Sequence, residues 1–185
     1  MPRPPDFADY RPHEHGEPIA VTVRAPTFED LSAVAHIWAE RENGDAQEAM
    51  PLIWKEWTLI RAQTLPRTIC VAEVAGEIAG YGRCGYRDAE GGLPEGWYLI
   101  GIIVSPPFRR RGVGRALTGY RLKQLILRGA EEVFYFTDVD NLASVALHKA
   151  FGFVEIDRGR LNPKQPEQTV RLLRTTLKRA GYRKG

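Results

Sequence analysis

One segment constrains the fold of this chain more than any other. A run with the composition of a buried strand ends at Val104, and a prolyl turn, three consecutive arginines and a Gly-Val-Gly triplet separate it from a helical pattern. Glycine has no Cβ and allows a ligand to approach the backbone closely. The first amides of a helix have no intrahelical partners, and the positive end of the helix dipole lies with them. Residues 104–117 therefore predict a strand, a loop and a helix that together bind a phosphate or pyrophosphate group.

The spacing of the glycines separates the classes of protein that build such a loop. A Walker P-loop needs Lys and then Ser or Thr after its last glycine, whereas Arg-Ala follows Gly114 here. A dinucleotide fingerprint needs a third glycine, where this chain has leucine, and its first glycine lies close to the strand, whereas seven residues separate Val104 from Gly112. Asp138, at the end of the next predicted strand, suits a ribose contact and leaves the dinucleotide alternative open.

A third pattern fits without change. Val-x-Pro-x-x-Arg-x-x-Gly-x-Gly, at 104–114, resembles the acetyl-CoA pyrophosphate loop of the GNAT superfamily of N-acetyltransferases. After another predicted strand at 133–139, residues 141–153 resemble the Asn-x-x-Ala/Ser…Gly-Phe helix of the same superfamily. Two motifs in the right order are more specific than either alone. The resemblance covers residues 20–157, and its motifs lie between 99 and 153.

The resemblance implies an α/β fold: a twisted, mixed β-sheet with helices on both faces, splayed between two parallel central strands at 97–104 and 133–139. It implies an enzyme that transfers the acetyl group of acetyl-CoA, as co-substrate and without a metal, to a primary amine of a small molecule. We expect direct attack in a ternary complex, because neither Cys70 nor Cys84 lies beside a base as an acyl carrier. Two alternatives stay open: an acceptor amine at a protein N-terminus or lysine, and a CoA-binding sensor or partner subunit without catalysis.

The resemblance also assigns the contacts to the cofactor. The backbone of 110–115 donates to the pyrophosphate, and the side chains of 109–111 reach phosphates, unless the three arginines are only a solvated charge run. At the end of the preceding strand the backbone pairs with the pantetheine arm, and one amide near Val104 polarises the thioester carbonyl. A single donor in that role is typically worth ~3 kcal/mol. The expected cofactor-binding residues are Ile102, Ile103, Val104, Arg109, Arg110, Arg111, Gly112, Val113, Gly114, Arg115, Asn141 and His148.

The expected catalytic groups are His148 and the amide of Val104. Asn141, Ser144 and His148 share one helix face, and the superfamily commonly has tyrosine at the position of His148, thought to protonate the departing CoA thiolate. An unperturbed imidazole has a pKa of ~6.5 and a thiol one of ~8.5, so transfer from imidazolium to thiolate is downhill. The alternative is that His148 only hydrogen-bonds the thioester sulfur or packs in the cleft. Asp140-Asn141 with a histidine at this offset also resembles, more weakly, aminoglycoside N-acetyltransferases.

A general base must take a proton from the acceptor ammonium, directly or through water. The strand at 97–104 contains no carboxylate. Glu95, just before that strand, Asp138, at the end of the next, and a chain of water molecules are the three alternatives, and the sequence does not decide between them.

Acidic residues are frequent in the region expected to select the acceptor, which comprises the first two helices, their link and the loop at 88–96. A rim of this kind attracts a cationic amine. Trp38, Trp54 and Trp57 either form a wall of the acceptor pocket or belong to the core. The acidic residues are Glu40, Glu42, Asp45, Glu48, Asp88, Glu90 and Glu95.

Composition excludes several other classes of protein. The net charge is +3, and the basic residues are scattered rather than interleaved with aromatics, so we expect no binding to nucleic acid. No stretch is apolar enough to span a membrane, and the N-terminus has no signal-peptide pattern, which predicts a cytoplasmic protein. The two cysteines form neither a disulfide framework nor a metal-ligand spacing. A homodimer remains open.

At 185 residues the chain predicts one domain with a single core. We expect a flexible, proline-rich arm at 1–18, an N-acetyltransferase domain at 19–178 and a basic tail at 179–185. Within the domain, strands are expected at 19–24, 67–74, 78–87, 97–104, 133–139, 153–157 and 169–175, and helices at 28–38, 46–63 and 113–128 and in the segment that follows Asn141.

Overall fold

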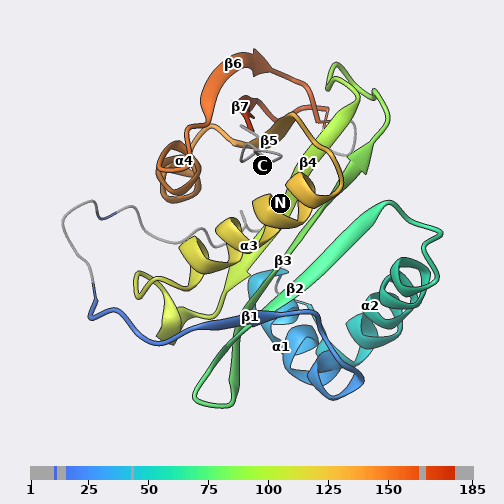
Figure 1. Ribbon diagram of the computed structural model, residues 1–185, viewed down its shortest axis with the longest axis vertical. Helices are drawn as coiled ribbons and strands as arrows, with labels where there is room; N and C mark the ends of the chain where they lie inside the picture. The colour runs from blue at the N-terminus through green and yellow to red at the C-terminus, as the bar shows by residue number, and fades with distance from the viewer. Residues whose placement is uncertain (1–10, 12–15, 43, 163–165, 178–185) are drawn as a thin grey trace, which may run out of the picture.

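The computed structural model describes residues 11, 16–42, 44–162 and 166–177, and these form one seven-stranded sheet with helices against it (Figure 1). The sheet has the order β1-β2-β3-β4-β5-β7-β6. In chain order the elements are β1 (Thr22–Arg24), α1 (Leu31–Glu42), α2 (Ala46–Arg61), β2 (Arg67–Val74), β3 (Glu77–Arg87), β4 (Gly96–Val104), α3 (Val113–Leu127), β5 (Glu132–Asp138), α4 (Leu142–Lys149), β6 (Val154–Gly159) and β7 (Val170–Thr176).

Helices cover both faces of the sheet, because alternate residues of the strands enter different cores. Ile69 and Val71 of β2 pack with α1 and α2, whereas Cys70 and Ala72 pack with Val113 and other residues of α3. In a strand, successive side chains point to opposite faces. The predicted α/β fold with a mixed sheet is therefore confirmed.

The sheet is splayed at its centre. β1 to β4 are antiparallel neighbours, and β5, β7 and β6 are antiparallel neighbours, whereas β4 and β5 run parallel. These two strands are paired only where Tyr98 lies beside Phe134. Beyond that point the carboxyl-terminal half of β4 and the end of β5 diverge, as expected from the resemblance (Figure 1).

A β-bulge interrupts β4 at the level of the splay. The register against β3 shifts between Gly82, opposite Ile102, and Arg83, opposite Ile100. The extra residue is Gly101, whose φ of 63° favours glycine. The bulge reverses the alternation of side chains between the two faces of the sheet. Leu99 and Ile102 are three residues apart and would face opposite sides of a regular strand, yet both pack on the α3 side.

The ends of the expected arm and tail lie largely outside the described residues. This holds for 1–10 and 12–15 of the arm, and for the whole tail at 179–185. The last residues of the arm lie against the arginine–glycine loop: Arg111 Nε donates to the Glu17 carbonyl at 3.5 Å, and the Ile19 amide donates to the Arg111 carbonyl at 3.4 Å. The first strand is shorter than expected and begins at Thr22.

Candidate active site

The arginine–glycine loop reverses the chain between β4 and α3. A short 3₁₀ turn at Pro106–Phe108 is followed by Arg110 and Gly112, both with positive φ, of 60° and 96°. Gly112 is the N-cap of α3 and supplies no side-chain cap. A Cβ built on Gly112 would meet nothing within 4 Å, so its conformation and not its surroundings favours glycine. The first amides of a helix have no intrahelical partners, so those of α3 can donate to an anion.

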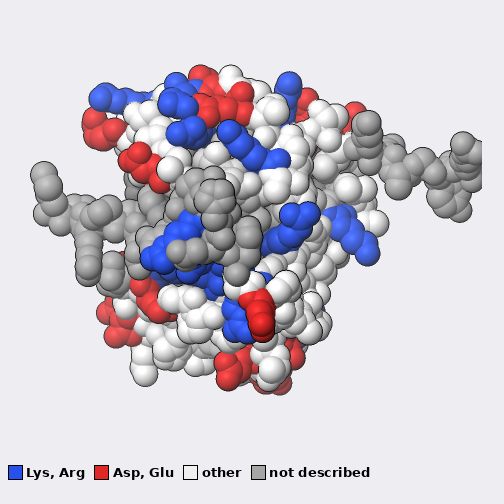
Figure 2. Space-filling view, turned by 90° about the vertical axis from the view of Figure 1, so that its left-hand side faces the viewer, with Lys and Arg blue, Asp and Glu red and all other residues white. Residues whose placement is uncertain are grey.

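The arginines of the loop differ in their contacts. Arg109 Nε donates to the Val104 carbonyl at 3.0 Å and so ties the loop to the end of β4. Arg115, whose side chain is exposed, has its guanidinium 5.5 Å from the ring centroid of Phe151. Lys and Arg side chains gather in the middle of the face seen in Figure 2, which is the side of the molecule that carries this loop. A basic surface here suits a phosphorylated ligand.

Beyond the bulge, the N–H and C=O groups of successive β4 residues point alternately toward β3 and into the splay. The Ser105 amide donates to the Ala79 carbonyl at 3.0 Å, so Ser105 and Ala79 form a hydrogen-bonded pair of the antiparallel ladder. By alternation Ile103 hydrogen-bonds β3, whereas the amides of Ile102 and Val104 point toward β5. Of the three residues expected to pair with a pantetheine arm, two therefore present their amides to the splay, and Ile103 does not.

Asn141 and Ser144 form the beginning of α4. The Asn141 side chain is the N-cap, and its Oδ1 accepts from the Ser144 amide at 3.2 Å. A side-chain oxygen that caps a helix explains why this residue type precedes α4 without any ligand contact. The structure therefore gives Asn141 a local role, and a cofactor contact of this residue stays a prediction.

His148 is completely buried and neutral. Its Nδ1 lies 2.8 Å from the Ser144 carbonyl, which can only accept, so Nδ1 carries the proton. Nε2 is then an acceptor, and it is buried without a hydrogen-bond partner among the described residues. Burial, reinforced by the positive charge of Arg121, lowers the pKa of His148 to about 3. An imidazole in this state has no proton to donate from Nε2 at neutral pH, which favours the alternative in which His148 accepts or packs.

Tyr135 of β5 belongs to the same cluster and was not singled out from the sequence. Its ring stacks on His148 with the centroids 3.7 Å apart, and its hydroxyl hydrogen-bonds the Ser144 hydroxyl. Burial raises its pKa to about 12, so the phenol keeps its proton. A tyrosine in the middle of an apolar strand is usual for a core, and only the position of α4 across the splay makes it a neighbour of His148.

The two candidate bases lie in different places. Glu95 is exposed and precedes the start of β4, at the end of the strand away from the bulge. Asp138 ends β5, four residues beyond Phe134, just as Ile102 lies four residues beyond Tyr98 in the parallel strand. Partial burial raises the pKa of Asp138, an effect that the charge of Arg41 opposes. Asp138 is therefore the carboxylate that the fold places level with the bulge, across the splay.

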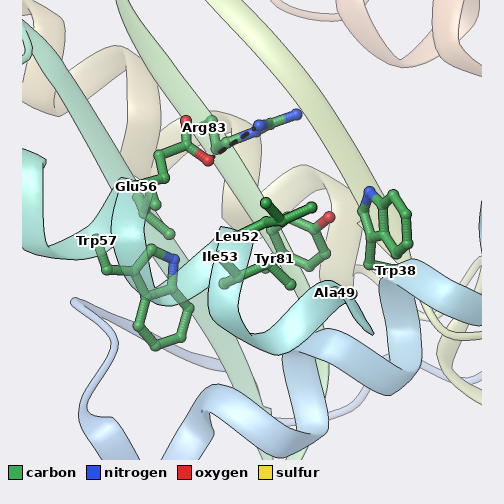
Figure 3. A pocket seen from close by; sticks show the side chains of 9 residues that line it. Trp38, Ala49, Leu52, Ile53, Glu56, Trp57, Tyr81 and Arg83 are labelled. Atoms are coloured by element: carbon green, nitrogen blue, oxygen red, sulfur yellow. Dashed lines mark hydrogen bonds and ion pairs between the residues drawn. The ribbon is translucent and has the colours of Figure 1, made fainter. Parts of the chain in front are cut away.

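A hollow of ≈ 150 Å³ lies on the opposite face from α3 (Figure 3). Its wall includes a charged group, in which Glu56 bridges Arg83 at 3.2 Å and Arg67 at 3.0 Å. A Cβ built on Gly101 would lie 3.3 Å from Arg83 Nη2, so the bulge of β4 lies beside a residue that lines the hollow. The lining residues are Trp38, Ala49, Leu52, Ile53, Glu56, Trp57, Ile69, Tyr81 and Arg83.

The tryptophans singled out from the sequence divide between the hollow and its support. Trp38 and Trp57 line the hollow, and Trp38 lies at one end of it in Figure 3. Trp54 instead packs edge-on against Phe28, with the ring centroids 5.0 Å apart. Tyr81 of β3 lies between Trp38 and Trp57 in Figure 3. It is buried, and burial raises its pKa to about 12. Two tryptophans, the phenol of Tyr81 and the ion pair of Glu56 and Arg83 thus line the hollow.

Comparison with known proteins agrees with this geometry. Residues 31–153 match the model of the Acetyltransferase (GNAT) family. The chain is similar in structure to a ribosomal-protein-alanine N-acetyltransferase from Brucella melitensis, with a TM-score of 0.67 and 22% identity, covering 84% of this chain and 99% of that one. It is also similar to a putative acetyltransferase from Salmonella typhimurium solved with acetyl-CoA, with a TM-score of 0.63 and 18% identity, covering 90% and 99%.

Curated relatives are similar over shorter segments. A [ribosomal protein bS18]-alanine N-acetyltransferase from Salmonella typhimurium is 37% identical over 57 residues, 31% of this chain and 38% of that protein. A mycothiol acetyltransferase from Arthrobacter sp. is 29% identical over 89 residues, 48% of this chain and 28% of that protein. The matched segments thus span about a third of these relatives' length.

The mixed α/β sheet, splayed between β4 and β5 and followed by the arginine–glycine loop before α3, defines the fold class. Within that class, the chain belongs to the GNAT acetyltransferase family, because the family model matches 31–153, more than half of its residues. Within the described part of the chain, no helix is long and apolar enough to cross a membrane.

Proposed function

We propose that this protein is an N-acetyltransferase that transfers the acetyl group of acetyl-CoA to the primary amine of a small molecule. One observation carries the proposal: the bulge of β4 lies at the splay and beside Arg83, which lines the hollow together with Trp38 and Glu56. The loop before α3 follows directly after the end of the same strand. A donor that enters from the loop and an acceptor that enters from the hollow would meet at Gly101.

The residues around the splay suit the donor. The amides of 113–115 and the exposed side chains of Arg110 and Arg115 would hold the pyrophosphate, because the first amides of a helix and guanidinium groups both bind phosphate oxygens. The amides of Ile102 and Val104 would bind the pantetheine arm as an added strand would. Acetyl-CoA supplies the activated acetyl group, as a thioester, when it is bound.

Asp138 is the base that we assign. It takes a proton from the acceptor ammonium, and the neutral nitrogen then forms a bond to the carbonyl carbon while the bond from carbon to sulfur breaks. The second proton of the nitrogen leaves, and the sulfur is released as a thiol, so the net products are an amide, CoA and one proton. A carboxylate whose pKa is raised by partial burial is better matched to this transfer than an exposed one.

His148 binds the donor and does not protonate it, in our proposal. Its Nε2 is an acceptor that no described residue satisfies, and a buried, unsatisfied acceptor is costly. An N–H or S–H group of the pantetheine arm would satisfy it. The thiolate would then take its proton from water rather than from the imidazole.

A protein N-terminal amine is the second candidate acceptor, because relatives named ribosomal-protein-alanine N-acetyltransferases are similar in sequence and in fold. The volume of the hollow, ≈ 150 Å³, favours a small acceptor or a single residue of a larger one. Both candidates need the same donor site, and they differ only in what extends out of the hollow.

The test is thiol release from acetyl-CoA in the presence of small primary amines, amino acids and peptides with N-terminal alanine. We expect at least one small amine to accelerate release, and Asp138→Asn to lower kcat by ~10²-fold, the usual contribution of a general base. Asp140→Asn, two residues away in the turn before α4, is the matched control and should retain activity. Activity on peptides alone would contradict the small-molecule acceptor, and unchanged activity of Asp138→Asn would contradict the assigned base.

A further inference from the structure

Arg121 is a fully buried arginine in the middle of the molecule. It lies on the face of α3 that also carries Leu117 and Leu125, and its exposed fraction is 0%. Arginine is rarely buried completely unless it is paired with an acid. Among the described residues, none of the hydrogen bonds of Arg121 reaches a carboxylate. Burial lowers the pKa of Arg121.

Backbone carbonyls take the place of the acid. Nη1 of Arg121 donates to the Arg83 carbonyl at 3.2 Å and to the Gly101 carbonyl at 3.1 Å, and so joins β3 to β4. Nε donates to the Leu117 carbonyl at 3.3 Å, and Nη2 to the Thr118 hydroxyl at 3.1 Å. Every nitrogen of the guanidinium therefore has an acceptor.

The two carbonyls bound by Nη1 belong to the bulge. Arg83 stands at the register shift, and Gly101 is the extra residue of β4. A bulge leaves its extra residue unpaired and disrupts the ladder locally, so these carbonyls need a donor from elsewhere. Gly82 makes room for that donor, because a Cβ on Gly82 would lie 3.1 Å from both Cδ and Nε of Arg121.

The direction of one peptide follows from this contact. The peptide between Gly101 and Ile102 is planar and trans, so its N–H points opposite to its carbonyl. Arg121 holds the carbonyl of Gly101 between β4 and β3, and the amide of Ile102 therefore points away from β3, into the splay. The alternation of the ladder independently gives the same direction for this amide.

We propose that Arg121 is a positioning residue that fixes the bulge of β4 and so aims the Ile102 amide at the thioester carbonyl of the donor. The inference rests on the proposed function, and it moves the polarising amide from Val104 to Ile102, the first donor after the bulge. Arginine suits this task because its planar fork reaches both strands from one nitrogen while the other nitrogens anchor it to α3. Lysine offers one donor centre and cannot make the same set of bonds.

The first readout does not require turnover. In the infrared spectrum of bound acetyl-CoA labelled with ¹³C at the thioester carbonyl, a hydrogen bond lowers the carbonyl frequency relative to the free molecule. We expect the wild type to show this lowering, and Arg121→Met to shift the band back toward the free value. A band at the free frequency in the wild type would overturn the inference, whereas a lowered band without turnover on any amine would contradict only the proposed acceptor.

The second readout is the split between kcat and binding. Loss of one oxyanion donor lowers kcat by ~10²-fold, so we expect that loss in Arg121→Met, a smaller loss in Arg121→Lys, and little change in the affinity for CoA, which has no acetyl carbonyl. Leu125→Ala, buried on the same helix face, is the control for a destabilised core and should retain kcat.

A third variant keeps the positive charge of Arg121 and displaces its side chain. Gly82→Ala places a methyl 3.1 Å from Arg121 Cδ and Nε, closer than nearly all such contacts, so the Arg121 side chain must give way by a few tenths of an ångström, and we expect its bonds to the bulge to weaken. We expect Gly82→Ala to lower kcat and to raise the carbonyl frequency in the same direction as Arg121→Met. If Arg121→Met does not fold, this variant still decides the question. Normal kcat and a normal band in Gly82→Ala, with Arg121 shown to be displaced by crystallography, would overturn the inference.

Discussion

Arg121 on α3 and His148 on α4 are both completely buried, both carry nitrogen donors, and they lie on the two helices beside the splay. Arg121 has an acceptor for each nitrogen, whereas His148 has a partner for Nδ1 and, among the residues that the structure describes, none for Nε2. A satisfied buried polar group is part of the scaffold, and an unsatisfied one has a cost that a ligand can remove. The difference agrees with the two proposed roles, in which Arg121 fixes the bulge of β4 and His148 accepts a hydrogen bond from the donor.

A second histidine shows that the difference lies in burial rather than in local geometry. His36 on α1 bonds the Ser32 carbonyl through Nδ1 at 2.7 Å, just as His148 bonds the Ser144 carbonyl at 2.8 Å. His36 is exposed, so water can satisfy its Nε2, whereas His148 is enclosed by Tyr135 and other aromatic side chains. His36 is therefore a matched control for each experiment on His148.

The largest effect is expected from Arg121→Ala. The substitution leaves a cavity and deprives the carbonyls of Arg83 and Gly101 of their donor, and we expect it to lower the free energy of unfolding by about 3–5 kcal/mol. Lys123→Ala, at an exposed position of the same helix, should change it by less than about 0.5 kcal/mol. Urea denaturation of both variants measures the difference, and a small effect in Arg121→Ala would show that the bulge does not depend on it.

Much of this site was open to prediction from the sequence, and the reasons differ from residue to residue. The loop that contains Gly112 was predictable because the residues of its motif are close together in the sequence, and because the backbone conformation of the loop favours glycine. The burial of Arg121 had a signal that was missed: it lies four residues after Leu117 and four before Leu125, on the apolar face of the helix. A glycine inside an apolar strand, as at Gly101, is likewise a sign of a bulge.

The protonation of His148 was not predictable in this way. The spacing from Asn141 places it on the correct face of α4, but its pKa depends on burial under β5 and on the charge of Arg121, which come from distant segments. The lowered pKa comes from tertiary packing, whereas the expectation of a general acid rests on the unperturbed pKa of imidazole. The assignment of Asp138 over Glu95 likewise needed the parallel register of β4 and β5.

The next effect is a dependence of stability on pH that arises from His148. Its pKa is lowered to about 3 in the folded state, whereas it is ~6.5 in the unfolded chain. Below pH 6.5 the unfolded chain binds a proton that the folded protein does not, so this contribution to stability is present above pH 6.5 and is lost as the pH falls toward 3. The loss approaches 1.4 kcal/mol per pH unit and amounts to about 2.5 kcal/mol between pH 6 and pH 4.

Denaturant titrations at pH 6, 5 and 4 measure this loss. His148→Phe removes the titrating group and should have a shallower slope than the wild type by about the amount stated. His36→Phe should keep the slope of the wild type, because it leaves His148 in place. Equal slopes in the wild type and His148→Phe would mean that His148 is protonated in the folded state, and would return it to the role of a general acid.

The smallest effect concerns the unsatisfied Nε2 of His148. Phenylalanine fills a similar volume without an orphaned acceptor, so His148→Phe should be as stable as the wild type at pH 7 within about 1 kcal/mol. If Nε2 accepts a hydrogen bond from the pantetheine arm, the same variant should bind CoA about tenfold more weakly, the loss expected for one hydrogen bond of roughly 1.4 kcal/mol. Calorimetric titration with CoA measures this, with His36→Phe as the control that keeps its affinity. Wild-type affinity in His148→Phe would make His148 a packing residue like its aromatic neighbours. His148 and Arg121 would then differ in whether their buried nitrogens are hydrogen-bonded, and that difference would have no consequence for binding of the donor.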